Sequence, residues 1–163
     1  MDNGLSGKKV LITGASSGIG AAIALTLAKK GCQVWGTTRD LSRVASLPSE
    51  LGQNIKFLTM DVTNDESVRI GFSQFIKEAG RIDILINNAG FGVFGPLEEF
   101  SIEETKNIFE TNYFGALRLI QTAVPKMREQ RKGLIINITS LAARFVIPFQ
   151  VHYSATKFAL DAL

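Results

Sequence analysis

The sequence predicts an α/β fold, a doubly wound parallel sheet with helices on both faces. Short apolar runs alternate with segments whose apolar residues recur at helical spacing over the 163 residues, which is typical of repeated βα units. The first apolar run, Val-Leu-Ile-Thr at residues 10–13, contains no charged residue, as expected for a strand that is buried on both faces. These two observations together favour a parallel sheet with a helical layer on each side.

Five strands are expected, at residues 10–13, 34–38, 55–60, 82–86 and 134–138. Helices are expected at residues 19–28, 40–51, 65–79 and 101–130, and from residue 153 onward. Gly31 and Gly80 follow two of these helices and suit their C-terminal ends. Within residues 101–130, Asn112 and Gly115 are poor helix formers, so a distortion is expected there. Two capping boxes are predicted from spacing, Thr63 with Glu66 and Ser101 with Glu104.

The composition excludes several classes of protein. The 18 basic and 15 acidic residues leave a net charge of +3, too small a surplus to indicate a nucleic-acid partner, and one cysteine cannot form an intrachain disulfide. The N-terminus lacks the apolar run of a signal peptide, and no apolar run approaches the roughly 20 residues of a membrane span. A cytoplasmic protein is therefore expected, with no metal site, since no His, Cys, Asp or Glu cluster has ligand spacing.

We expect one domain over residues 1–163 that is incomplete at its C-terminal side. The last helix stops at Leu163 after about ten residues, near the short end for a helix. A parallel sheet that ended on residues 134–138 would leave an apolar edge strand unpaired.

A glycine-rich loop follows the first strand. It reads Thr-Gly-Ala-Ser-Ser-Gly-Ile-Gly over residues 13–20, so that the glycines are spaced as G-x-x-x-G-x-G. A strand, a tight turn and a helix N-terminus present free N–H groups and the helix dipole to a phosphate. The loop predicts the pyrophosphate site of a Rossmann-type domain, although an ordinary glycine-rich turn is the alternative. The residues expected to bind there are Gly14, Ser16, Ser17, Gly18, Ile19 and Gly20.

Further cofactor contacts are expected where the other strands end, because strand C-termini line the crevice of an open α/β sheet. Arg39 lies about 20 residues past the loop and could pair with a 2′-phosphate, which favours NADP. Its neighbour Asp40 could instead take the ribose hydroxyls of NAD, the less favoured cofactor. Asp61 and Val62 end the third strand, and Asn88, Ala89 and Gly90 follow the fourth.

Tyr153 and Lys157 are the leading catalytic candidates. They are four residues apart and hence lie on one face of a helix. A phenol is normally too weak an acid for proton transfer near neutral pH, and an ammonium that stabilises the phenolate would make this tyrosine a usable proton donor or acceptor. Ser140, at the end of the fifth strand, could hydrogen-bond a substrate oxygen or simply cap a turn. His152 is left out, because adjacent helical residues point about 100° apart.

Together these segments resemble the short-chain dehydrogenase/reductase family, in its simple oxidoreductase branch. The resemblance is carried by the loop at 13–20, by Asn87-Asn88-Ala89-Gly90, Asn112 and Ser140, and by Tyr153-Ser154-Ala155-Thr156-Lys157. The stretches at residues 90–96 and 153–160 look most like the hydroxysteroid and retinol dehydrogenase members. The resemblance implies an oxidoreductase that transfers a hydride between nicotinamide and a carbonyl or secondary alcohol.

The resemblance also implies roles for single residues. Tyr153 would be the general acid/base, Lys157 would assist it and bind the nicotinamide ribose, and Ser140 would hold the substrate oxygen. The backbone carbonyl of Asn112 would support a water in a proton relay. Members of the family continue for two more strands and a substrate-binding loop, and full-length forms commonly assemble as homo-oligomers through the helices around Asn112 and Tyr153.

The expected substrate is a small carbonyl compound or alcohol, and an apolar one if Phe91, Phe94 and Phe145 line its pocket. Two alternatives to an NADP-dependent enzyme remain open. The chain could be a non-catalytic nucleotide-binding fragment, because it stops at Leu163, or part of an NAD-linked enzyme of the same family, because of Asp40.

Overall fold

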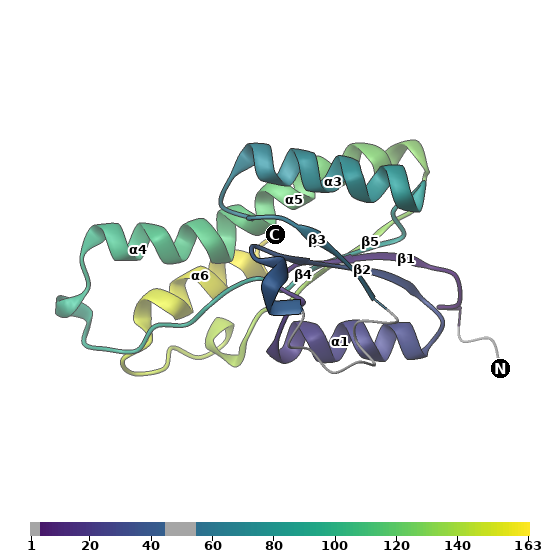
Figure 1. Ribbon diagram of the computed structural model, residues 1–163. Coiled ribbons are helices and arrows are strands. Elements are labelled where there is room, and N and C mark those ends of the chain that lie inside the picture. The colour runs from purple at the N-terminus through teal and green to yellow at the C-terminus, as the bar shows by residue number, and fades with distance from the viewer. Residues whose placement is uncertain (1–3, 45–54) are drawn as a thin grey trace.

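The computed structural model describes residues 4–44 and 55–163, which build one five-stranded parallel sheet between layers of helices (Figure 1). The sheet order is β3-β2-β1-β4-β5, and every neighbouring pair is parallel. The order reverses between β1 and β4, which confirms the predicted doubly wound α/β arrangement. The strands are β1 (Lys9–Ile12), β2 (Gln33–Thr38), β3 (Ile55–Thr59), β4 (Ile84–Asn87) and β5 (Leu134–Asn137).

Helices cover both faces of the sheet. Helix α1 packs on one face and α3 and α5 pack on the other, whereas α4 and α6 extend beyond the ends of the strands, at the left of Figure 1. The α-helices are α1 (Gly18–Lys29), α3 (Asp65–Ala79), α4 (Ile102–Phe109), α5 (Gly115–Glu129) and α6 (Val151–Asp161). Shorter segments are the 3-10 helices η1 (Leu41–Val44), η2 (Leu97–Glu99) and η4 (Leu141–Ala143), and the π-helix η3 (Glu110–Phe114).

The alternation of side chains along each strand divides the core into two clusters. In β1, Val10 and Ile12 pack in the cluster on the α1 side, whereas Leu11 packs in the cluster with α3 and α5. The second cluster includes Trp35, whose ring meets Phe75 of α3 edge-on, with the ring centroids 5.3 Å apart. Burial on both faces explains why the strands read as continuous apolar runs.

The structure corrects one predicted capping box and confirms the other. Helix α3 is capped by Asn64, whose side chain accepts a hydrogen bond from the Ser67 amide. Thr63 does not cap this helix, because its hydroxyl donates to the Asp61 carboxylate instead. Helix α4 does carry the predicted box, in which Ser101 bonds the Glu104 amide and the Glu104 side chain accepts from the Ser101 amide.

The expected distortion of the long helix is present. Residues 101–130 are divided into α4, η3 and α5, and the π-helical turn η3 contains Asn112. A Cβ on Gly115, the first residue of α5, would come within 2.7 Å of the Val62 side chain, so glycine allows α5 to approach the loop after β3. Of the helix expected at 40–51, the structure shows η1 only, because residues 45–54 lie outside the described residues.

Strand β5 is an edge of the sheet. Among the described residues it pairs with β4 alone, and Leu134 and Ile136 are exposed on the side that β4 turns toward α1. This agrees with the expected apolar edge strand. None of the helices in the described ranges has the length and hydropathy that a bilayer crossing requires.

Candidate active site

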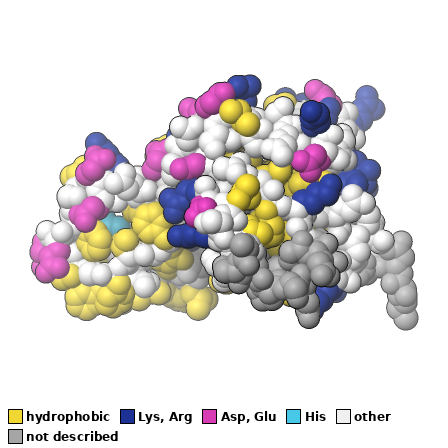
Figure 2. Space-filling view, in the orientation of Figure 1, with side chains coloured by type: hydrophobic (Ala, Val, Ile, Leu, Met, Phe, Trp, Pro, Cys, Tyr) yellow, Lys and Arg dark blue, Asp and Glu magenta, His cyan; other side chains and the backbone are white. Residues whose placement is uncertain are grey.

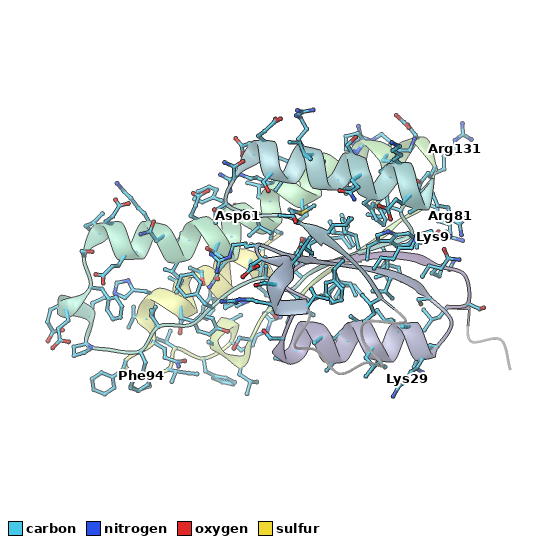
Figure 3. All side chains as sticks on the ribbon, viewed as in Figure 1. Lys9, Lys29, Asp61, Arg81, Phe94 and Arg131 are labelled. Atoms are coloured by element: carbon cyan, nitrogen blue, oxygen red, sulfur yellow. The ribbon has the colours of Figure 1, made fainter. Side chains whose placement is uncertain are left out.

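A cavity of about 930 Å³ lies at the C-terminal ends of the strands, where the strand order reverses. This is the position at which open α/β sheets bind their ligands. Figure 3 shows Asp61 just past the end of β3, on the side of the sheet toward α4 and α6. Lys9 and Arg81 are labelled at the opposite edge, where the strands begin.

The cavity brings together every residue that the sequence predicts as a cofactor contact. These residues are Gly14, Ser16, Ser17, Gly18, Ile19, Gly20, Arg39, Asp61, Val62, Asn88, Ala89, Gly90, Tyr153 and Lys157. They come from the loop after β1 and the first turn of α1, from the ends of β2, β3 and β4, and from α6. The other two predicted catalytic residues, Asn112 and Ser140, are not on its lining.

The glycine-rich loop is held against the end of β4 at van der Waals distance. Gly14 has a φ of +65°, and a Cβ there would lie 3.0 Å from the Cα of Ala89. A Cβ on Gly20 would come within 2.4 Å of both the Gly14 carbonyl oxygen and the Asn88 side-chain nitrogen. Only glycine fits at these positions, because one requires a left-handed backbone and the other leaves no space for a side chain.

Thr13 and Asn88 tie the loop to β4 through hydrogen bonds. The Thr13 hydroxyl accepts from the amides of Asn88 and Ala89, each at 3.0 Å. The Asn88 side chain donates to the backbone carbonyls of Thr13 and Gly14, at 2.9 and 3.1 Å. The start of α1 is thereby fixed over the cavity. Ser17 at its N-cap makes no side-chain capping bond, and the first turn has no acidic residue, so the N-terminal amides can receive an anion.

Two arginines and one acid lie at the end of β2. Arg39, Asp40 and Arg43 all line the cavity. The Asp40 carboxylate accepts a hydrogen bond from the Ser42 amide at 2.8 Å, and the hydrogen bonds from Ser42 hold the pKa of Asp40 below its ordinary value. The side chain of Arg39 forms no ion pair with a residue of the described ranges and is exposed at the cavity mouth.

Lys157 is a buried residue of the cavity lining. Its Nζ donates to the backbone carbonyl of Ile138 at 2.8 Å and lies 5.7 Å from the centre of the Tyr153 ring. Burial lowers the pKa of the Lys157 ammonium below its ordinary value, because the charged form loses hydration. The two residues face the same cavity from α6, as their spacing predicts.

Asn112 lies behind the cavity wall and links three parts of the site. Its Oδ1 accepts from the Phe91 amide at 3.0 Å, and its Nδ2 donates to the Phe91 carbonyl at 2.9 Å. The same Nδ2 donates to the Thr156 hydroxyl at 3.0 Å, and this hydroxyl donates to the Tyr153 carbonyl at 2.7 Å. The buried amide of Asn112 thus connects η3, the loop after β4 and the first turns of α6.

Ser140 and His152 make contacts outside the cavity. The Ser140 hydroxyl accepts from the Ala142 amide at 3.1 Å and caps η4, which is the turn-capping alternative for this serine. The Nδ1 of His152 lies 3.1 Å from the Thr105 hydroxyl, and its ring packs on Phe100. The imidazole therefore points toward α4.

Some cavity residues were missed by the sequence reasoning. They include Thr37, Thr38, Arg43, Thr63, Thr111 and Thr139. Arg43 could have been found as a second arginine four residues after Arg39, in the segment that follows β2. Thr37 is a buried polar residue near the end of β2. Its hydroxyl has no hydrogen-bond partner among the described residues.

Comparison with known proteins identifies relatives over nearly the whole chain. A family model described as short chain dehydrogenase matches residues 8–163. A 3-ketodihydrosphingosine reductase of Bacteroides thetaiotaomicron is 45% identical over 152 residues, which are 93% of this chain and 54% of that protein. Retinol dehydrogenase 8 of Homo sapiens is 42% identical over 161 residues, which are 94% of this chain and 51% of that protein. The chain thus spans about half the length of these curated relatives.

Solved structures share the fold. A structure of ElxO with NADP bound is 32% identical and has a TM-score of 0.90, covering 96% of this chain and 64% of that one. A short-chain dehydrogenase from Streptomyces avermitilis is 36% identical with a TM-score of 0.89, covering 96% of this chain and 58% of that one. Each likeness covers nearly all of this chain.

Proposed function

Because the chain belongs to the short-chain dehydrogenase family, we propose that it is the catalytic part of an NADP-dependent oxidoreductase. The reaction is the transfer of a hydride between nicotinamide and a carbonyl or secondary alcohol. The observation that carries the proposal is the single cavity shared by the glycine-rich loop, Arg39, Tyr153 and Lys157. Phosphate recognition and proton transfer can therefore act on one bound pair of molecules.

The residues present fit a dinucleotide. The amides at the start of α1 suit a pyrophosphate, and the Thr37 hydroxyl, which no described residue bonds, offers a polar partner inside the cavity. Gly14 and Gly20 leave room for close backbone approach. Asp61 and Asn88–Gly90 would contact the adenosine part, and Lys157 the nicotinamide ribose. When bound, the nicotinamide supplies or takes up the hydride.

Tyr153 moves the proton in this proposal. In the reducing direction its hydroxyl donates a proton to the carbonyl oxygen of the substrate, and in the oxidising direction its phenolate accepts one from the alcohol. The buried Lys157 holds its ammonium beside the ring, where positive charge stabilises the phenolate. Ser140 would hold the substrate oxygen, which requires its hydroxyl to be free to donate while it accepts from Ala142. The carbonyl of Asn112, within the π-helical turn, would support the water that returns the proton.

The proton-transfer role is tested by Tyr153→Phe in the full-length protein. Turnover should fall by at least about a hundredfold, because general acid–base groups contribute about 10²–10⁴. The dissociation constant for NADPH, read from its fluorescence, should change by less than about twofold. Wild-type turnover in the variant would end this mechanism.

The preference for NADP rests on Arg39. Its guanidinium is exposed at the cavity mouth, whereas the Asp40 carboxylate is already engaged by Ser42. Arg39→Ala should raise the dissociation constant for NADPH by about 10- to 150-fold and leave that for NADH nearly unchanged, since a charge-assisted bond contributes about 1.5–3 kcal/mol. Arg128→Ala, in the last turn of α5, is the matched control. An NADH preference in the wild type would instead favour the NAD-linked alternative.

A non-catalytic nucleotide-binding role is the second candidate. It is favoured because the chain spans only 54% of the 3-ketodihydrosphingosine reductase and 51% of retinol dehydrogenase 8. The 163-residue chain should bind NADPH in either case. Reduction of a carbonyl by this chain alone would refute the non-catalytic role. We expect the full-length protein to be cytoplasmic and homo-oligomeric, which fractionation and sedimentation would test.

A further inference from the structure

We propose that the substrate carries a bulky, uncharged apolar group, and that Phe94 and Phe149 form the surface that binds it. This inference rests on the proposed function and adds a substrate class to it. The two phenylalanines come from the loops that follow β4 and β5, and the second loop leads directly into α6 and Tyr153.

The two loops are joined beside the candidate active site. The Gly95 amide donates to the Phe149 carbonyl at 2.8 Å, and the rings of Phe94 and Phe149 lie 5.7 Å apart at an angle of 36°. Phe94 is nevertheless 69% exposed and Phe149 is 53% exposed. The two rings therefore contact each other, and the rest of each ring surface is open to another molecule.

Phe149 has an unusual backbone conformation. Its φ is +64°, in the left-handed region that bulky residues rarely adopt. An exposed ring gains little from burial in the protein to offset this strain, and strained residues of this kind cluster at ligand sites. The position four residues before Tyr153 suggests that the strain serves to aim the ring at the bound molecule.

The aromatic surface continues to the proton donor. Phe91 lines the cavity together with Tyr153, and the backbone of Gly92 is so close that a Cβ there would lie 3.7 Å from the Tyr153 ring. Figure 2 shows apolar side chains gathered at the left end of the molecule, where Figure 3 labels Phe94. A substrate with its oxygen at Tyr153 can therefore extend an apolar group along the loops toward Phe94.

The composition of the two loops disfavours a charged or strongly polar group on this part of the substrate. Residues 88–97 and 145–151 contain no acidic or basic side chain. Arg144, which precedes the second stretch, is paired with Asp161 at 2.7 Å. A phosphate or carboxylate on this part of the substrate would find no cation in either stretch, and a polyhydroxylated sugar would face apolar rings. Exposed apolar patches of this kind mark ligand or interaction sites, and continuity with the cavity favours the substrate as the occupant.

The test uses the full-length protein and methyl ketones whose alkyl chain lengthens from ethyl to octyl. With NADPH in excess, kcat/KM should rise by up to about fourfold for each methylene that becomes buried. Phe149→Asn removes the ring but retains a residue that tolerates positive φ. It should raise KM for the octyl ketone about tenfold or more and leave kcat/KM for the ethyl ketone within about twofold. Phe94→Ser should act in the same direction.

Ile70→Asn on α3 is the control, because Ile70 is exposed to a similar degree, 54%, on another face of the molecule. It should leave the whole series unchanged. A flat series in an active wild-type enzyme, or an equal loss for all ketones in Phe149→Asn, would overturn the inference while the proposed function stands. The inference would also be overturned if kcat/KM rose with ketone chain length as steeply in both phenylalanine variants as in the wild type. That result would indicate that the patch binds a membrane or another protein segment.

A second readout does not depend on turnover. The octyl ketone should displace a fluorescent apolar probe from the wild-type protein, and the half-displacing concentration should rise about tenfold in Phe149→Asn. Displacement without turnover of any carbonyl or alcohol would reject the proposed function and retain the apolar site. Equal displacement from both proteins would reject the apolar site.

Discussion

Replacement of Asn112 by alanine should destabilise the fold more than any exposed substitution in the same segment. The buried side chain makes three hydrogen bonds, two with the Phe91 backbone and one with the Thr156 hydroxyl. Each unsatisfied buried group costs about 1–3 kcal/mol. Thr156 still donates to Tyr153 after the change, so the main loss falls on the Phe91 amide and carbonyl. We expect a loss of about 3–4 kcal/mol in the free energy of unfolding.

Urea unfolding of the 163-residue chain, followed by far-UV circular dichroism, measures this loss. The midpoint should fall while the slope with urea concentration stays constant, because the surface exposed on unfolding is nearly the same. Thermal unfolding should shift down by about 10 °C, at about 2–4 °C for each kcal/mol in a chain of this size.

Asn107→Ala is the matched control, because Asn107 is exposed on α4 one turn earlier. It should change stability by no more than about 0.5 kcal/mol. A loss below about 1 kcal/mol in Asn112→Ala, or equal losses in the two variants, would refute the view that this amide holds the Phe91 loop and α6 together.

Three further results are expected. Gly20→Ala should weaken NADPH binding more than about tenfold in a fluorescence titration, because its Cβ would overlap the Gly14 carbonyl oxygen; Gly80→Ala, which adds strain at a φ of +78° with open space around it, should not. The unfolded chain binds the Lys157 proton more strongly than the folded chain, whose pKa is lowered by burial, so stability should rise as the pH increases through the lowered pKa toward 10.5. Urea unfolding at successive pH values should show a smaller rise in Lys157→Met. Arg118→Met removes ion pairs with Asp65 and Glu110 and should cost about 1 kcal/mol, with a smaller loss in high salt.

Much of the fold follows from local patterns in the sequence. The apolar runs predict the five strands because parallel strands are buried on both faces, and the glycine-rich loop predicts the start of α1. Boundaries were less accurate. Thr63 has the spacing of a cap but bonds Asp61, and Asn64 takes the capping position instead. Two adjacent residues can both cap a helix, and the contact with Asp61 decides between them.

The sequence by itself determined which residues form the candidate site. Each group of site residues is either contiguous or spaced by one helical turn, so a local pattern identifies it. Gly14 to Gly20, Asn88 to Gly90, and Tyr153 with Lys157 are local signals of this kind. Their meeting in one cavity follows from the parallel sheet, in which all C-terminal strand ends lie at the same edge.

Only the tertiary structure decided how the surrounding residues act. Asn112 reaches Phe91 and Thr156, which are 21 and 44 residues away in sequence, and no local pattern specifies those partners. Phe149 meets Phe94 because the Gly95 amide bonds its carbonyl across two loops. Local spacing sets the direction of a side chain, whereas its partners depend on how separate loops pack at the end of the sheet.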